Sequence, residues 1–334
     1  MTSRHQVALD RVRENLLDVM GETIRGLMAE PDVTDIILNP PLPGEEHGRL
    51  WVSRLGCERQ PVDFMSPEQA MRLIGAVASS MRIEATEDTP SVQGHLITDG
   101  SRFQGCIPPI VPGPFFAIRK HASAVFPLQS YVDNGQMTEG QKAIIEDTIE
   151  RRLNLLVVGG TGAGKTTLLN ALLLAVTEIH PHHRIFGIED TRELKCSSLD
   201  QTFTLTSSNL DIRALVKIAM RAFADRIIIG EVRDGAALDI LKAGNTGHEG
   251  WLSTVHANSA TSALKRMEQL VAEVSAAPQQ EAIADAVNII VSMQRGKDGK
   301  RAVRQILACK GWENGKYVLE EAVPEITNQL QSET

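Results

Sequence analysis

Residues 159–167 read Gly159-Gly160-Thr161-Gly162-Ala163-Gly164-Lys165-Thr166-Thr167 and match the phosphate-binding pattern G-x-x-x-x-G-K-[ST]. An apolar run over residues 153–158 predicts a buried strand before the stretch, and residues 167–176 predict a helix after it. The glycines let backbone N–H groups turn toward phosphate oxygens, while the helix N-terminus and the lysine add positive charge. The sequence therefore predicts a nucleoside-triphosphate site, with Lys165 at the β- and γ-phosphates and Thr166 on Mg²⁺.

The residues after this loop alternate between predicted strands and helices. Strands are expected over 184–188, 226–231 and 251–255, and helices after Ser208 and over 260–271 and 278–286. A final hairpin is expected from 288–293 and 302–307 around the turn Gly296-Lys297-Asp298-Gly299. Such alternation predicts an α/β domain, residues 138–334, with a mostly parallel sheet and helices on both faces.

The first 125 residues have a different pattern. Apolar side chains from Val12 to Leu27 recur at helical spacing, a strand is expected over 33–38 with a hairpin partner over 48–55, and Ser66 begins a second helix. Short strands follow, among them 95–97, 101–103 and 115–120. These features predict a smaller α+β domain over residues 1–125. Residues 126–137 are the expected linker, and Thr138 and Gln141 form a capping-box pattern that begins the larger domain.

Composition narrows the class of protein. A chain of 334 residues favours two domains, and 42% hydrophobic with 23% charged residues is typical of a globular protein. The net charge of −8 argues against stable nucleic-acid binding or a general affinity for anionic membranes. No transmembrane or signal segment is expected, and the four widely spaced cysteines predict structural thiols in a reducing compartment. We therefore expect a cytoplasmic protein with at most peripheral membrane association.

Polar side chains gather at the C-terminal ends of the predicted strands, where ligands bind in a parallel sheet. Besides the phosphate loop, we place there Glu189, Asp190, Glu193, Glu231, His248, Thr254 and His256. Hydrolysis of ATP needs a metal ion at the β- and γ-phosphates, an oriented water and positive charge on the transferred group. The acids and the loop together predict this chemistry.

Glu231 holds a central place among these acids. Many ATPases have Asp-Glu after an apolar strand, but this chain has Gly230-Glu231. Thr166 and Glu231 are candidates to hold Mg²⁺ directly or through water, and either Glu193 or Glu231 orients the attacking water. For His256, a γ-phosphate sensor and a structural histidine are equally open.

Five arginines are candidates for phosphate contacts across a domain or subunit boundary: Arg102, Arg119, Arg221, Arg226 and Arg233. A single arginine is usually a surface charge, so its position alone identifies none of them.

Four stretches in fixed order resemble a known family. They are 159–167, 188–194 (Ile-Glu-Asp-Thr-Arg-Glu-Leu), 225–233 (Asp-Arg-Ile-Ile-Ile-Gly-Glu-Val-Arg) and 247–259 (Gly-His-Glu-Gly-Trp-Leu-Ser-Thr-Val-His-Ala-Asn-Ser). They look like the Walker A, aspartate box, Walker B and histidine box of the secretion ATPase superfamily. The chain most resembles the TrbB-like conjugative-transfer ATPases of type IV secretion systems, over about residues 10–310.

The resemblance implies a RecA-like P-loop ATPase domain in a homohexameric ring at the cytoplasmic face of a DNA-transfer channel. ATP would lie between the two domains. Glu193 would match the catalytic glutamate, Glu231 the Walker B acid, His256 the histidine-box sensor, and Arg119 a nucleotide contact from the N-terminal domain. Secretion-channel or inner-membrane transfer proteins are the implied partners. Before Walker B the family usually reads Arg-Met-Arg-Pro-Asp-Arg, whereas residues 221–226 here read Arg-Ala-Phe-Ala-Asp-Arg. One arginine and the proline are missing, so an arginine role in this segment rests on Arg221 or Arg226.

Three other interpretations remain open. A pilus-retraction or type II secretion ATPase shares these motifs, although the assembly ATPases of those systems typically carry a tetracysteine zinc module that this sequence lacks. A nucleotide-gated scaffold would bind ATP with little turnover, against which Glu193 and Glu231 argue. Direct DNA translocation would need basic residues facing a ring pore, which the acidic balance disfavours.

Overall fold

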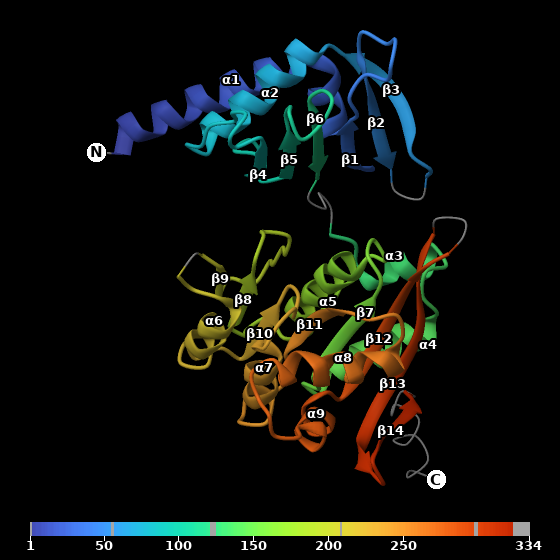
Figure 1. The fold of residues 1–334 in the computed structure, drawn as a ribbon. Coiled ribbons are helices and arrows are strands. Elements are labelled where there is room, and N and C mark those ends of the chain that lie inside the picture. The colour runs from blue at the N-terminus through green and yellow to red at the C-terminus, as the bar shows by residue number, and fades with distance from the viewer. Residues whose placement is uncertain (1, 55–56, 121–124, 208, 297–299, 323–334) are drawn as a thin grey trace. The chain divides into compact units, whose positions relative to one another are not determined.

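The computed structural model describes residues 2–54, 57–120, 125–207, 209–296 and 300–322. The chain divides into two compact units, Met1–Ala124 and Val125–Thr334 (Figure 1). Ser208 and the turn residues Lys297, Asp298 and Gly299 lie outside the described residues, as does the end of the expected second domain.

The first unit contains a six-stranded antiparallel sheet in the order β3-β2-β1-β6-β5-β4. Its strands are β1 (Val33–Leu38), β2 (Gly48–Arg54), β3 (Gln60–Met65), β4 (Ser91–His95), β5 (Arg102–Cys106) and β6 (Phe115–Arg119). The pairing of β1 with β2 confirms the expected hairpin. The strand expected over 95–97 is wrong, because Leu96 begins the turn between β4 and β5 and its N–H donates to the Ser101 carbonyl.

Two helices, α1 (Thr2–Ala29) and α2 (Pro67–Ser80), pack against this sheet. Leu16 and Ile24 of α1 and Leu73 of α2 share a core with Ile36 and Phe116. Ser66 caps α2 in a capping box, as its sequence predicts.

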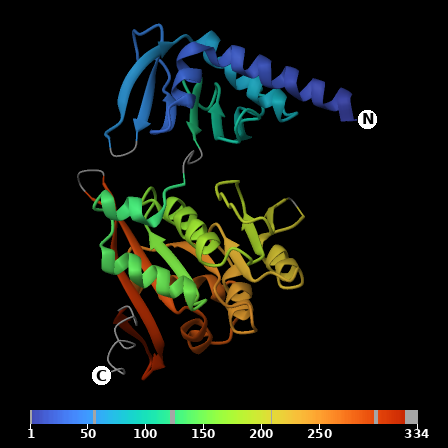
Figure 2. The same cartoon turned by 180° about the vertical axis from the view of Figure 1, so that it is seen from behind.

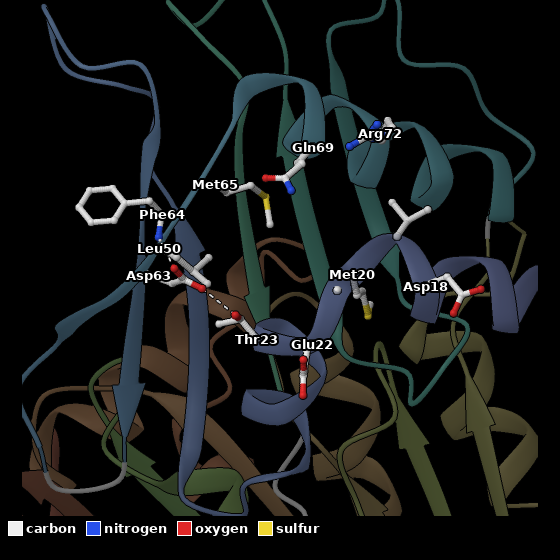
Figure 3. A pocket seen from close by; sticks show the side chains of 12 residues that line it. Asp18, Met20, Glu22, Thr23, Leu50, Asp63, Phe64, Met65, Gln69 and Arg72 are labelled. Atoms are coloured by element: carbon white, nitrogen blue, oxygen red, sulfur yellow. Dashed lines mark hydrogen bonds between the residues drawn. The ribbon is translucent and has the colours of Figure 1, made fainter.

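The helical path of α1 is interrupted at Gly21, which has φ 72° and ψ 176°. Beside this break a cavity of about 450 Å³ lies between α1, strands β2 and β3 and the start of α2 (Figure 3). Thr23 of α1 donates a 2.6 Å hydrogen bond to Asp63 of β3 across it. This hydrogen bond joins the second half of α1 to the edge of the sheet.

The second unit contains an eight-stranded sheet in the order β14-β13-β12-β7-β11-β10-β8-β9. The strands are β7 (Leu155–Gly159), β8 (Ile185–Glu189), β9 (Gln201–Leu205), β10 (Arg226–Ile229), β11 (Leu252–His256), β12 (Ile289–Arg295), β13 (Arg301–Glu313) and β14 (Lys316–Glu321). Pairs from β12 through β7 to β9 are parallel, while β12–β13 and β13–β14 are antiparallel. The expected mostly parallel sheet and its final hairpin are therefore confirmed.

Helices cover both faces of this sheet (Figures 1 and 2). They are α3 (Leu128–Asp133), α4 (Glu139–Glu150), α5 (Lys165–Ile179), α6 (Ile212–Ala219), α7 (Ala236–Gly244), α8 (Ala260–Ala272) and α9 (Gln280–Ala286). Strand side chains alternate between faces. Leu156 and Val158 of β7 therefore join the core under α6–α9, while Leu155 and Val157 join the core under α3–α5.

One expectation about this unit differs from the structure. Much of the stretch expected as a linker, 126–137, forms helix α3, and its Leu128 and Tyr131 are buried in the core under α5. Proline and glycine near its ends suggested a loop, but apolar packing orders the residues between them. Helix α6 follows Ser208 as expected, and its N-cap is Asp211, whose side chain accepts a hydrogen bond from the Ala214 N–H.

Within the described chain, no helix combines the length and the apolar composition that a membrane span requires.

Candidate nucleotide site

The phosphate loop lies where the sequence predicts it, between the fully buried strand β7 and helix α5. Gly162 and Gly164 have φ of +74° and +93°, a conformation that side chains rarely adopt. A Cβ at Gly159 would lie 2.6 Å from the Met293 carbonyl oxygen of the neighbouring strand β12. Backbone conformation and close packing therefore require glycine at these positions.

Lys165 begins α5 and is 7% exposed. Its Nζ donates to the carbonyl oxygens of Gly159 at 3.0 Å and Gly160 at 3.3 Å, and lies 3.1 Å from His256 Nδ1. Burial lowers the pKa of this ammonium group, and the nearby Glu231 carboxylate acts in the opposite direction. The lysine thus lies across the mouth of the loop.

A chain of polar contacts continues from this lysine along the carboxyl edge of the sheet. His256 ends β11, and its Nε2 lies 2.9 Å from Glu231 Oε1, just beyond β10. Glu231 Oε2 accepts a 2.7 Å hydrogen bond from Arg233, which also lies 3.4 Å from Asp190, just beyond β8. Strand order explains this meeting, because β8, β10, β11 and β7 are neighbours and parallel.

The ring of His256 lies between two charged groups. Lys165 Nζ is 3.1 Å from Nδ1 and 3.5 Å from Nε2, and Glu231 Oε1 is 2.9 Å from Nε2. Partial burial lowers the pKa of His256, with Glu231 acting in the opposite direction and Lys165 adding to the lowering. A neutral imidazole therefore links the loop lysine to the Glu231 carboxylate.

Glu189 and Glu193 have different environments. Glu189 is 3% exposed, and its Oε1 accepts 2.7 Å hydrogen bonds from the backbone N–H groups of Glu193 and Leu194. Burial raises the pKa of Glu189 to about 6. Asn170 of α5 donates to the Glu193 carbonyl at 2.9 Å and accepts from the Lys195 N–H at 2.8 Å. Glu189 and Asn170 therefore fix the loop that carries the partly exposed Glu193.

The oxygen donors at this edge fit Mg²⁺ bound together with a nucleotide. Thr166 supplies a hydroxyl in the first turn of α5 and Glu231 a carboxylate, both hard ligands. No group of three or more histidine, cysteine, aspartate and glutamate side chains in the described parts of the chain is arranged to hold a metal ion. This donor set matches a Mg²⁺ that keeps waters and takes ligands from phosphates, and does not match an all-protein cage.

Two expected placements need correction. His248 precedes β11 and therefore lies at the opposite edge of the sheet from the phosphate loop. Arg226, at the start of β10, also lies at that edge and is fully buried, donating to the carbonyls of Ile149 at 2.6 Å and Gly250 at 3.2 Å. Its burial and its bonds to backbone carbonyls, away from the phosphate loop, indicate a structural residue. Thr254, by contrast, lies near the carboxyl end of β11 as expected. It is buried, and its hydroxyl donates to the Gly230 carbonyl at 2.8 Å, beside Glu231.

The remaining arginines stay predictions. Arg119 lies in the first unit, where its Nε donates to Asp35 at 2.9 Å. Arg221 is exposed, beyond the end of α6.

Sequence reasoning missed three polar residues near the loop. Asn170 lies inside an apolar helical run, and an asparagine there was itself a signal of a local partner. Lys265 and Arg266 of α8 line a cavity of about 380 Å³ beside Gly160 and Thr161. The sequence could have indicated them, because they lie near the start of the helix that follows His256.

Fold and site together define a P-loop nucleotide-binding protein of the RecA-like class: a parallel sheet, a phosphate loop at its carboxyl edge, and acids on the neighbouring strands.

Comparison with known proteins gives the family. The chain belongs to the Type II/IV secretion system protein family, a family of secretion ATPases, whose model matches residues 65–314. It is 42% identical over 310 residues to the conjugal transfer protein TrbB of Rhizobium radiobacter, covering 93% of this chain and 94% of that protein. The probable conjugal transfer protein TrbB of Sinorhizobium fredii is also 42% identical, covering 93% of each chain.

A solved structure supports the fold. The Legionella pneumophila ATPase DotB has a TM-score of 0.61 at 15% identity, covering 90% of this chain and 80% of that one. The family resemblance and the fold class expected from the four motifs are therefore confirmed.

Proposed function

We propose that this protein is an ATP-hydrolysing traffic or assembly motor of a type IV secretion system that transfers DNA by conjugation. The observation that supports this most is the continuous polar chain from Lys165 through His256 and Glu231 to Arg233 and Asp190. Similarity to TrbB proteins named for conjugal transfer supports the assignment to this system.

Each residue of the site has a proposed role. Lys165 exchanges its bonds to loop carbonyls for the β- and γ-phosphates of ATP. Thr166 and Glu231 hold Mg²⁺, which neutralises charge on the phosphates. Glu193 or Glu231 orients the attacking water, and the remaining acid completes the metal shell. His256 reports the γ-phosphate, because movement of Lys165 toward the nucleotide removes the hydrogen-bond donor on Nδ1.

The assembly and its place in the cell are part of the proposal. Subunits form a homohexameric ring at the inner face of the cytoplasmic membrane, where the ring contacts secretion-channel or inner-membrane transfer proteins. ATP binds between the two domains with Arg119 as a contact, and the cycle of binding, hydrolysis and release moves one domain against the other.

Mg²⁺-dependent ATP hydrolysis by the purified chain across a protein concentration series tests the proposal, beside Lys165→Ala and Glu193→Ala. Glu320→Ala is the matched control, because Glu320 is an exposed acid on the edge strand β14. We expect specific activity that rises with assembly, is lost in Lys165→Ala and Glu193→Ala, and persists in the control. Tight Lys165-dependent ATP binding without turnover in an assembled ring would instead favour the nucleotide-gated scaffold.

A further inference from the structure

The cavity beside the phosphate loop is cationic. Its volume is about 380 Å³, and it is lined by Gly160, Thr161, His256, Ala257, Asn258, Ser262, Lys265, Arg266 and Gln269. These lining residues include a lysine, an arginine and a histidine but no acid. In a chain with a net charge of −8, a cavity with this lining selects for an anion.

The cavity shares two walls with the site of Lys165. Gly160 lines it, and the carbonyl of that residue accepts from Lys165 Nζ at 3.3 Å. His256 also lines it while contacting the same Nζ at 3.1 Å. The cavity therefore adjoins the first residues of the loop beside Lys165, the residue that we expect at the β- and γ-phosphates of a bound triphosphate.

Helix α8 holds the two long cationic side chains at this place. Ser259 caps the helix in a capping box, and Ala263, Leu264 and Met267 are buried in the core under α6–α9. Lys265 and Arg266 lie between these buried positions, and Arg266 donates to Gln269 at 3.3 Å. The positive charge of Arg266 also contributes to lowering the pKa of His256, which agrees with their proximity.

We propose that this cavity is a binding site for a phosphate group, with Lys265 and Arg266 as its contact residues. It holds the terminal phosphate of ATP before hydrolysis and the released orthophosphate afterwards. Water passes a proton to the acid that orients it and attacks the γ-phosphorus, and the bond to the β–γ bridging oxygen breaks. ADP and orthophosphate then separate, so that the cavity provides a position for one product while ADP stays in the loop. This inference rests on the proposed ATP site and extends it to γ-phosphate discrimination and product release.

Nucleotide binding tests the proposal without relying on turnover. The full chain and its Lys265→Ala, Arg266→Ala and double variants are titrated with ATP and with ADP in the presence of Mg²⁺. Lys217→Ala is the matched control, because Lys217 is exposed on the surface helix α6. We expect the double variant to bind ATP about 10-fold more weakly and ADP within twofold of the unchanged chain, since only ATP places a phosphate in the cavity. Arg266→Lys, which keeps the charge, should recover part of the loss.

A second measurement distinguishes binding of free orthophosphate from binding of the terminal phosphate of ATP. Broadening of the ³¹P resonance of orthophosphate, recorded with ADP present, should appear with the unchanged chain and disappear with the double variant. The cavity proposal would be overturned if the double variant bound ATP and ADP equally more weakly, or if its affinity for both were unchanged. In either case, nucleotide binding that still depends on Lys165 would leave the proposed function standing. Absence of any Lys165-dependent nucleotide binding would overturn both.

Discussion

Each unit of this protein has a lysine whose pKa is lowered by burial, and the two lysines have different surroundings. Lys120, just after β6 in the first unit, donates to the carbonyls of Leu27, in the last turn of α1, and Glu30, just beyond it. Lys165, in the second unit, also donates to carbonyls but contacts His256 as well, and through it Glu231. Lys120 stabilises a helix end, whereas Lys165 is the first member of a polar chain that crosses the sheet.

The comparison shows that burial of a charge does not by itself indicate a functional site. Ion pairs of the first unit, such as Arg119–Asp35 and Arg54–Asp32, are separate surface contacts. At the carboxyl edge of the second unit, the charges of parallel neighbouring strands are connected and face an open loop. A connected series of charged side chains at the carboxyl edge is therefore the feature that distinguishes the second unit from the first. Four substitutions test this difference.

The largest effect is expected for Glu231→Gln. Removing the central carboxylate of the chain should lower the rate of ATP hydrolysis by about 100-fold or more, because an acid that orients or activates water contributes that much. ATP binding should persist. Asp32→Asn, at a surface pair of the first unit, should leave hydrolysis within about twofold. A Glu231→Gln enzyme with normal turnover would transfer the catalytic role to Glu193.

Arg226→Met tests the structural arginine at the opposite edge of the second sheet. The variant loses donors to the buried carbonyls of Ile149 and Gly250, so we expect the free energy of unfolding to fall by about 3 kcal/mol. Arg54→Met in the first unit removes a partly exposed ion pair and should cost less than about 1 kcal/mol. Denaturant unfolding of both variants measures the difference, and equal costs would contradict the buried role of Arg226.

Glu189→Gln should change the pH dependence of stability. Because the pKa of Glu189 rises from 4.5 to about 6 on folding, the folded state binds more protons in this window, and stability falls as the pH rises through it. The rise in pKa corresponds to a loss of about 2 kcal/mol in the free energy of unfolding once the pH is above this window. The glutamine keeps an acceptor for the Glu193 and Leu194 N–H groups, so the variant should be more stable than the unchanged chain above pH 6. The control Glu320→Gln, on an edge strand, should leave the dependence of unfolding free energy on pH unchanged. If Glu189→Gln also left this dependence unchanged, the raised pKa assigned to Glu189 would be contradicted.

The smallest effect is expected for Thr23→Val in the first unit. The Thr23 hydroxyl is the main cause of the lowered pKa of Asp63, so this pKa should rise toward its ordinary value, as NMR titration would show. Because Asp63 is exposed, solvent screening should keep the loss of stability below about 1 kcal/mol. Unchanged titration of Asp63 would show that the hydrogen bond across the cavity in Figure 3 does not form in solution.

Sequence alone could predict the features that depend on short patterns. Buried β-branched runs, the glycine loop and the capping residues Ser66 and Thr138 each determine local structure, so the parallel sheet and its helices followed from them. The acids beyond β8 and β10 could be placed because parallel strands share one carboxyl edge. The same argument, applied to the start of β10, would have excluded Arg226.

Features that depend on tertiary contacts could not be predicted in this way. Helix α3 forms where proline and glycine suggested a linker, because Leu128 and Tyr131 find a core that only the folded unit provides. The edge strand β14 was missed, since none of its side chains is buried and its order comes from pairing with β13. The contact between Lys165 and His256 needed the register of β7 against β11, which pairs His256 with Gly159.

The central claim is that the connected polar chain at the phosphate loop is the ATP site. Titration of the full chain with ATP and Mg²⁺, comparing Lys165→Met with Lys120→Met, tests it most directly, because both changes remove a lysine with a lowered pKa and keep its apolar stem. We predict that Lys165→Met weakens ATP binding by at least about 30-fold, as expected for loss of a buried charge–phosphate contact, while Lys120→Met stays within a few-fold of the unchanged chain. Equal affinities in the two variants would contradict the claim.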